Sequence, residues 1–200
     1  MKKIAINIVL LPTKRMINKI IVINKKLLKT NKNKIILGDK INLPHISLCM
    51  GGVHENEVDK VIKEVDIISN NFSQFNFKGK LKAQISSNNE KITWVVILNK
   101  KKIQELHELV MKKMRSYLNY DIKNYMFYNP QEIEQSTMSW VRDYSNLYYD
   151  SSQFEPHITV GIGETENSKE TIFFSSSKIA IFQLGNYCTC KKLIYSTNLS

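Results

Sequence analysis

The sequence predicts an α+β protein whose two halves are each built around a strand that carries the same short motif. β-branched apolar runs typical of strands occur near both ends of the chain and in its middle. Between them lie segments with apolar residues at the three- to four-residue spacing of amphipathic helices. The pattern Pro-His-Ile-Ser/Thr occurs twice, at 44–47 and at 156–159. The order motif strand, helix, strands, helix, motif strand favours an α+β sandwich of lobes.

The first half of the chain is expected to begin with a strand, because Lys3 to Leu11 is apolar and β-branched and ends at Pro12. Gly51 and Gly52 are expected to end the first motif strand. The other elements expected here are a helix over 16–29, a short strand over 35–37 and a helix over 54–69 that begins with a solvated His54.

The second half is expected to pair strands around one long helix and to end in strands. The elements are one or two strands over 72–85, a buried strand over 92–98, a helix over 100–118, the second motif strand, a polar turn over 161–169, one or two strands over 171–184, a turn at 185–186 and a strand over 191–195. His107 lies among lysines and glutamates on the long helix, so a surface position is predicted. Residues 119–153 lack simple periodicity and are expected to be an insertion or lid-like segment with one helix over 132–146.

Each motif places a histidine and a hydroxyl on one face of a strand, because side chains alternate between faces. His45 and Ser47 share a face in the first motif, and His157 and Thr159 share a face in the second. The apolar residues between them point to the opposite face, where they anchor the strand in a core. The two polar side chains of a motif are roughly 7 Å apart along the strand.

Two histidines that meet across a groove have the chemistry needed for in-line attack on a phosphodiester. A neutral imidazole accepts the proton of the nucleophile, and a protonated one donates a proton to the leaving oxygen. Ser47 and Thr159 are then placed to bind the non-bridging phosphate oxygens. This arrangement requires no metal and no cofactor. A single histidine of this kind is as often a packed core residue, so the repetition of the motif carries the prediction.

The two motifs, HISL at 45–48 and HITV at 157–160, resemble the paired motifs of the 2H phosphoesterase superfamily, which includes 2′-5′ RNA ligase-like proteins and cyclic phosphodiesterases. The opening IAINIVLLP and the closing IAIFQLGNYCTCKKLIY also resemble strands of that family. The resemblance implies a two-lobed fold with antiparallel sheets flanked by helices, a central cleft between the motifs and pseudo-twofold symmetry. It implies metal-independent chemistry on RNA ends or nucleotides that carry a 2′,3′-cyclic phosphate or a 2′-5′ linkage.

Length and composition favour a single soluble domain with an anionic partner. The 200 residues are expected to form one domain, and a net charge of +11 points to RNA or a nucleotide, although lysine and asparagine are abundant throughout. Three cysteines form no disulfide framework, which favours a cytoplasmic location. No apolar run approaches the ~20 residues that span a bilayer, so no membrane contact is expected. A monomer is expected.

Aromatic residues of the 119–153 segment are candidates for nucleoside contacts. Tyr144, Tyr148 and Tyr149 are the three closest to the second motif, and base stacking on such rings contributes about 1–3 kcal/mol per base. The alternative is that they pack the segment onto the body of the protein. Lys178, Lys191 and Lys192 are candidates for phosphate binding. Two other functions remain open: hydrolysis of small cyclic oligonucleotide signals, and RNA binding without catalysis.

Overall fold

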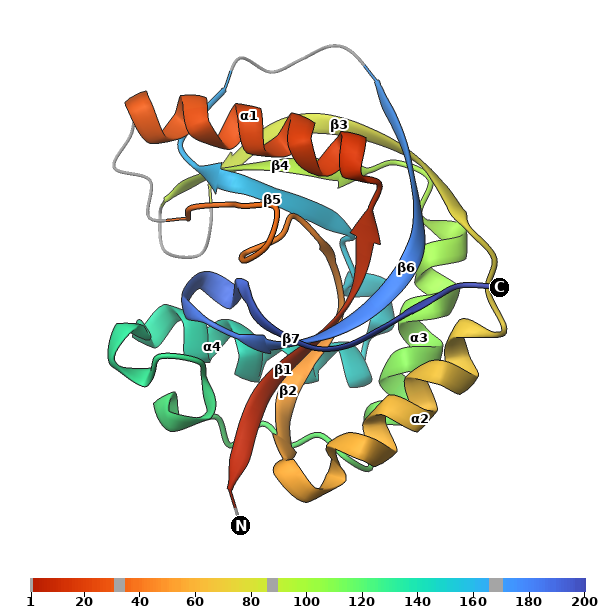
Figure 1. The fold of residues 1–200 in the computed structure, drawn as a ribbon. Helices are drawn as coiled ribbons and strands as arrows, with labels where there is room; N and C mark the ends of the chain where they lie inside the picture. The colour runs from red at the N-terminus through yellow and green to blue at the C-terminus, as the bar shows by residue number, and fades with distance from the viewer. Residues whose placement is uncertain (1, 31–34, 86–89, 166–170) are drawn as a thin grey trace.

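Seven antiparallel strands form one continuous sheet in the computed structural model, which describes residues 2–30, 35–85, 90–165 and 171–200 (Figure 1). The strand order is β1-β2-β5-β4-β3-β6-β7, and β6 also pairs with β1. The strands are β1 (Lys3–Pro12), β2 (Ile46–His54), β3 (Phe75–Ile85), β4 (Lys91–Ile97), β5 (His157–Ile162), β6 (Ile172–Leu184) and β7 (Cys190–Asn198). The α-helices described are α1 (Lys14–Thr30), α2 (Val58–Ser69), α3 (Lys101–Met114) and α4 (Gln135–Asp143).

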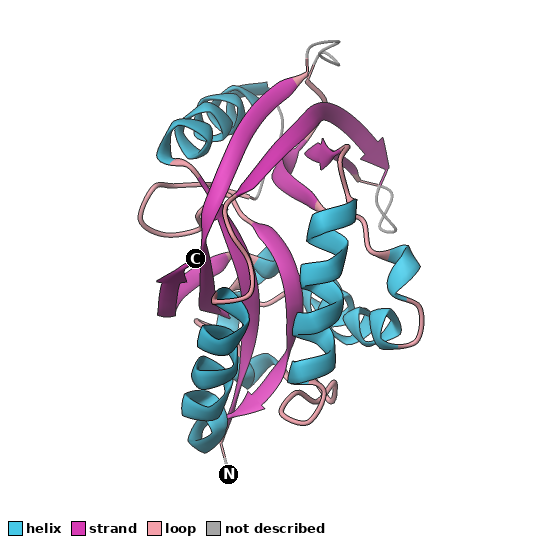
Figure 2. Ribbon diagram, turned by 90° about the vertical axis from the view of Figure 1, so that its right-hand side faces the viewer, coloured by secondary structure: helices cyan, strands magenta, loops and turns pink. Residues whose placement is uncertain are grey.

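The long strand β6 divides the sheet into two lobes. Its first residues pair with β3, and its later residues lie between β1 and β7. One lobe therefore contains β3, β4 and β5, with α1 packed against β5, and the other contains β1, β2 and β7, with α2 and α3 packed on β7 and β2. In the turned view of Figure 2 the longest strands run through both lobes between these helices. At the centre, β2 meets β5 through the single pair Ile46 and Ile158.

The hydrophobic core follows the alternation predicted for the two motif strands. Ile46 and Leu48 of β2 and Ile158 and Val160 of β5 are fully buried in one cluster with apolar residues of α1, α2 and α3. Burial of such side chains contributes about 1.5–3 kcal/mol each. The polar residues of each motif are consequently fixed on the opposite face.

The first motif strand does not end at the two glycines, contrary to the prediction. β2 continues through Gly51 and Gly52 to His54, and α2 begins only at Val58. Gly52 N donates to Asn119 O and Asn119 N to Gly52 O, both at 2.9 Å. A Cβ on Gly51 would lie 3.2 Å from the Cβ of Leu118. The glycines therefore do not end the strand. They permit close approach of a neighbouring backbone, which is a known use of glycine within a strand.

Two further predictions are corrected by tertiary contacts. Residues 35–37 form no strand, because Asn24 of α1 hydrogen-bonds their backbone at Ile35 O (2.8 Å) and Leu37 N (3.1 Å). His107 is fully buried instead of lying on the surface: its ring stacks on Phe154 at 3.8 Å, and its Nδ1 donates to Leu48 O at 2.7 Å. The segment 119–153 holds α4 and several short 3-10 turns.

Candidate functional site

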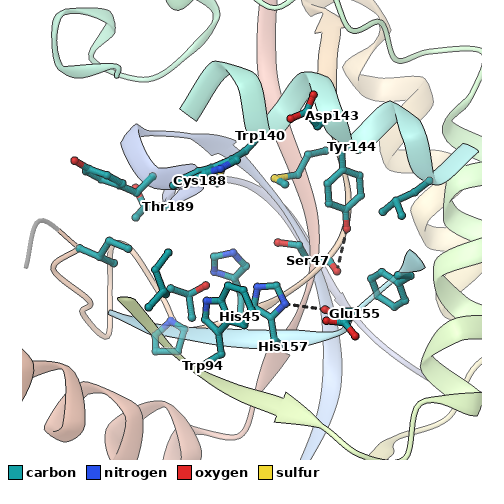
Figure 3. Close-up of a pocket in the computed structure, with 18 of the residues that line it drawn as sticks. His45, Ser47, Trp94, Trp140, Asp143, Tyr144, Glu155, His157, Cys188 and Thr189 are labelled. Carbon is teal, nitrogen blue, oxygen red and sulfur yellow. Dashed lines mark hydrogen bonds between the residues drawn. The ribbon is translucent and has the colours of Figure 1, made fainter. Parts of the chain in front are cut away.

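The two motifs meet in one cavity of about 430 Å³ at the junction of the lobes (Figure 3). His45, Ser47, His157 and Thr159 all line it. Each of these four side chains is partly buried, whereas the residues between them are fully buried on the other face. The alternation expected from the sequence therefore places both histidines and both hydroxyls in the same space.

Both imidazoles are held in the same way by their own strands. His45 Nδ1 lies 2.7 Å from Leu43 O, and His157 Nδ1 lies 2.7 Å from Glu155 O. A carbonyl oxygen only accepts, so Nδ1 carries the proton in each ring. This contact fixes the ring orientation and leaves Nε2 as the nitrogen available to a ligand. Cys190 Sγ also lies 3.3 Å from His45 Nδ1.

The environment disfavours the charged form of both histidines. Burial lowers the pKa of His45 to about 4, an effect that the hydrogen bond to Leu43 opposes and the charge of His157 reinforces. Burial also lowers the pKa of His157, but there the Glu155 carbonyl and the Glu155 carboxylate both oppose it. The two rings thus influence each other's protonation, and His157 has a carboxylate nearby that favours its cationic form.

Asn7 of β1 is a site residue that the sequence analysis missed. Its Nδ2 donates to Ser47 Oγ at 2.8 Å and lies 3.4 Å from His45 Nε2. Asn7 is fully buried in the apolar run of β1, and its Oδ1 has no hydrogen-bond partner among the described residues. A buried amide in such a strand is costly unless it is bonded. Its position as the single polar residue within IAINIVLLP was the sequence signal that could have identified Asn7 as a site residue.

Trp94 of β4 is the second residue missed. Its ring stacks on His157 with centroids 4.6 Å apart and an interplanar angle of 26°. In the sheet Trp94 stands directly opposite Thr159. The apolar run 92–98 predicts a buried strand and no more, because a run without alternating polar residues does not reveal which face is open.

The tyrosines of the 119–153 segment divide between the cavity and its surroundings. Tyr144 lines the cavity, and its hydroxyl donates to Ser47 O at 3.4 Å (Figure 3). Tyr148 packs edge-on against Tyr120 at 5.5 Å, and Tyr149 is 85% exposed; neither lines the cavity. The short 3-10 turn over 144–148 points successive side chains in different directions, so the structure brings one of the three to the site.

A strained turn forms another wall of the cavity. Tyr187 and Cys188, both lining residues, have left-handed backbones with φ of 57° and 54°. Asn186 holds this turn against α4, because its Oδ1 accepts from Thr137 Oγ1 at 2.7 Å and from Glu134 N at 3.1 Å. Non-glycine residues keep this conformation only where the surroundings enforce it.

Charged side chains around the cavity are acidic. Asp143 and Glu155 line it, whereas no lysine or arginine does among residues 2–30, 35–85, 90–165 and 171–200. Lys178, Lys191 and Lys192 lie on β6 and β7 and are not among the lining residues. In the same described ranges, no group of three or more His, Cys, Asp or Glu side chains is arranged to hold a metal ion, and no helix is long and apolar enough to cross a membrane.

Comparisons with known proteins establish the fold. Scans against protein-family models and curated proteins found no match. The crystal structure of TT0787 of Thermus thermophilus aligns with a TM-score of 0.59 at 11% identity, covering 98% of each chain. Escherichia coli LigT complexed with ATP aligns with a TM-score of 0.47 at 12% identity, covering 100% of this chain and 99% of that one. The chain therefore shares the two-lobed α+β fold of TT0787 over nearly its full length.

Proposed function

We propose that this protein is a metal-independent phosphoesterase that acts on a 2′,3′-cyclic phosphate or a 2′-5′ phosphodiester of RNA ends or nucleotides. The observation that carries the proposal is the matched pair of imidazoles, each oriented through Nδ1 by its own strand, in one cavity with two hydroxyls. The resemblance of HISL and HITV to the motifs of the 2H phosphoesterase superfamily supports the same chemistry.

In the proposed hydrolysis, Nε2 of one histidine removes a proton from water, and the water oxygen bonds to phosphorus. The P–O bond to the leaving ribose oxygen breaks, and Nε2–H of the other histidine protonates that oxygen. Ser47 Oγ and Thr159 Oγ1 donate to the non-bridging oxygens as charge develops on them. The reverse reaction, which joins ends, uses the same two residues in exchanged roles.

The surroundings favour His45 as the base and His157 as the acid. His45 has a pKa lowered to about 4 and is neutral at physiological pH. Burial lowers the pKa of His157 as well, but the Glu155 carbonyl and carboxylate oppose that effect, and the negative charge of a bound phosphodiester would oppose it further.

The test is product analysis on nucleoside 2′,3′-cyclic phosphates and 2′-5′-linked dinucleotides in EDTA. We expect turnover by the wild type, loss of about 10²–10⁴-fold in His45→Ala and in His157→Ala, and no loss in the matched control His54→Ala at the far end of β2. Turnover that survives both substitutions would refute the paired mechanism.

The roles are separated with a nucleoside nitrophenyl phosphodiester, whose leaving group needs no proton. We expect His157→Ala to recover most of its activity on this substrate, whereas His45→Ala stays inactive. The opposite pattern would exchange the two roles.

A second candidate is hydrolysis of small cyclic oligonucleotide signals. The volume of about 430 Å³ favours it, because that is the size of a typical small-molecule site. Faster turnover of a cyclic dinucleotide than of any RNA end would select this candidate. RNA binding without catalysis is the expected conclusion if no substrate is turned over and tight RNA binding is retained in both His45→Ala and His157→Ala.

A further inference from the structure

We propose that Lys78, Lys80 and Lys82 of β3, called here the β3 lysine row, bind the phosphate backbone of a single-stranded polynucleotide whose reacting phosphodiester occupies the cavity. This inference rests on the proposed function and names the substrate class as a chain that extends beyond the cavity. It is drawn from the register of three neighbouring strands, which lie side by side in Figure 1.

The strand register places the β3 lysine row on the face of the sheet that carries the second motif. Lys82 stands opposite Trp94, and Trp94 stands opposite Thr159. One step along, Lys80 stands opposite Val96, which in turn stands opposite His157. Directly opposed residues in antiparallel strands share a face. Two strand spacings, about 10 Å, therefore separate the backbone of His157 from that of Lys80.

The β3 lysine row is available to an anionic ligand. All three side chains are exposed, and none forms an ion pair with a carboxylate within the described residues. Their spacing of two residues gives about 7 Å between neighbours, which suits consecutive phosphates of an extended strand. Three exposed cations in a row on one sheet face form a local positive field.

Exposed apolar side chains accompany the lysines on this face. Phe173 of β6 stands opposite Lys78 and is 70% exposed, and Leu98, whose N donates to Lys78 O at 2.8 Å, is 52% exposed. A cationic row beside an exposed aromatic ring is the combination that binds single strands, through phosphates and base stacking together. A double helix cannot offer its bases in this way, so a single strand is the occupant.

The cavity by itself offers little positive charge to a polynucleotide. Its lining within the described chain contains carboxylates but no lysine or arginine, so it neutralises a phosphate only through its histidines and hydroxyl donors. A polynucleotide carries further phosphates outside the cavity, and the β3 lysine row provides their counter-charges. A nucleoside 2′,3′-cyclic phosphate has one phosphate, which occupies the cavity, and no further phosphate for the row to bind.

The experiment measures binding and turnover separately. Fluorescence anisotropy with a labelled single-stranded RNA of about eight nucleotides, a normal site size, is recorded over a range of salt concentrations in the His45→Ala background, which leaves the probe intact. Turnover of a nucleoside 2′,3′-cyclic phosphate is recorded with His45 present. The variant is Lys78→Ala/Lys80→Ala/Lys82→Ala. The charge-matched control is Lys14→Ala/Lys19→Ala/Lys25→Ala on α1, which packs against the opposite face.

We expect the β3 variant to lose about tenfold or more in RNA affinity at 0.1 M salt and to lower the slope of log affinity against log salt by about 2, at ~0.7 per phosphate contact. The α1 control should keep the wild-type affinity, and both variants should keep mononucleotide turnover. Unchanged RNA affinity in the β3 variant, an equal loss in both variants, or no RNA binding by the parent protein would overturn the inference. Absence of turnover by the wild type on nucleoside 2′,3′-cyclic phosphates, 2′-5′-linked dinucleotides and RNA ends alike would instead refute the proposed function, and the binding comparison would still decide the role of the lysines.

Discussion

At the scale of single residues, the two histidines of the site are chemically identical but lie in different surroundings. Both histidines donate through Nδ1 to the carbonyl two residues earlier, so their orientation is the same. They differ in their neighbours: His45 lies against the amide of Asn7 and the thiol of Cys190, whereas His157 lies against the ring of Trp94 and near the carboxylate of Glu155. The neighbours named for His45 carry no negative charge, whereas those of His157 include the Glu155 carboxylate.

The lowered pKa of His45 predicts a pH dependence of stability. The folded protein resists protonation at His45 down to about pH 4, whereas the unfolded chain takes up that proton near its ordinary value of 6.5. The unfolded state binds more protons between these values, so stability is lost as the pH falls from 6.5 towards 4. Between pH 7 and pH 5, we expect the free energy of unfolding of His45→Gln to fall by about 1–2 kcal/mol less than that of the wild type, measured by urea unfolding. Equal losses in the two proteins would contradict the shift.

At the scale of elements, the turn between β6 and β7 determines one wall of the cavity. Asn186 Oδ1 is the common acceptor that joins this turn to the start of α4, and its partner Thr137 is fully buried. The left-handed conformations of Tyr187 and Cys188 depend on that attachment.

Asn186→Ala should therefore destabilise the protein by about 1–3 kcal/mol, the cost of leaving buried polar groups without a partner. Because the turn contacts the ligand space and not the reacting atoms, we expect a higher KM with nearly unchanged kcat on a cyclic phosphate substrate. Asn71→Ala, which removes an exposed side-chain bond at the end of α2, is the matched control. A fall in kcat with constant KM would show that the turn acts on the reaction itself.

At the scale of the whole molecule, the lobes are joined by shared strands. β6 belongs to both lobes, and the fully buried pair Ile46 and Ile158 connects β2 to β5 at the centre. One core cluster includes side chains from both lobes. We therefore expect the lobes to unfold together, as one cooperative unit.

The two tryptophans of the chain test this, because Trp94 lies in β4 and Trp140 in α4. Trp140→Phe leaves a fluorescent reporter in the lobe of β3, β4 and β5, and Trp94→Phe leaves one beside the other lobe. We expect each variant to give the same urea midpoint by tryptophan fluorescence as by far-ultraviolet circular dichroism. A fluorescence midpoint that departs from the dichroism midpoint of the same variant would show that one lobe unfolds first.

The α+β class and most of its elements could be predicted from the sequence because they depend on local periodicity. The strands at 3–11 and 92–98 and the helices at 16–29 and 100–118 differ from the observed elements mainly at their ends. The same alternation predicted that His45 and Ser47 share a face and that Ile46 is buried. These features need only the order of neighbouring residues.

Tertiary structure decided what depends on residues distant in the sequence. Only folding brings Asn7 against Ser47, turns His107 from an expected surface residue into a buried one, and uses Gly52 for close approach to Asn119. The alternation of Lys78, Lys80 and Lys82 was visible in the sequence, but the strand register was needed to place it on the face of His157. The sequence thus determined which face of its strand each motif residue occupies. The pairing of distant strands decided which of them meet, because register and packing are set by contacts between segments and not by the pattern within one.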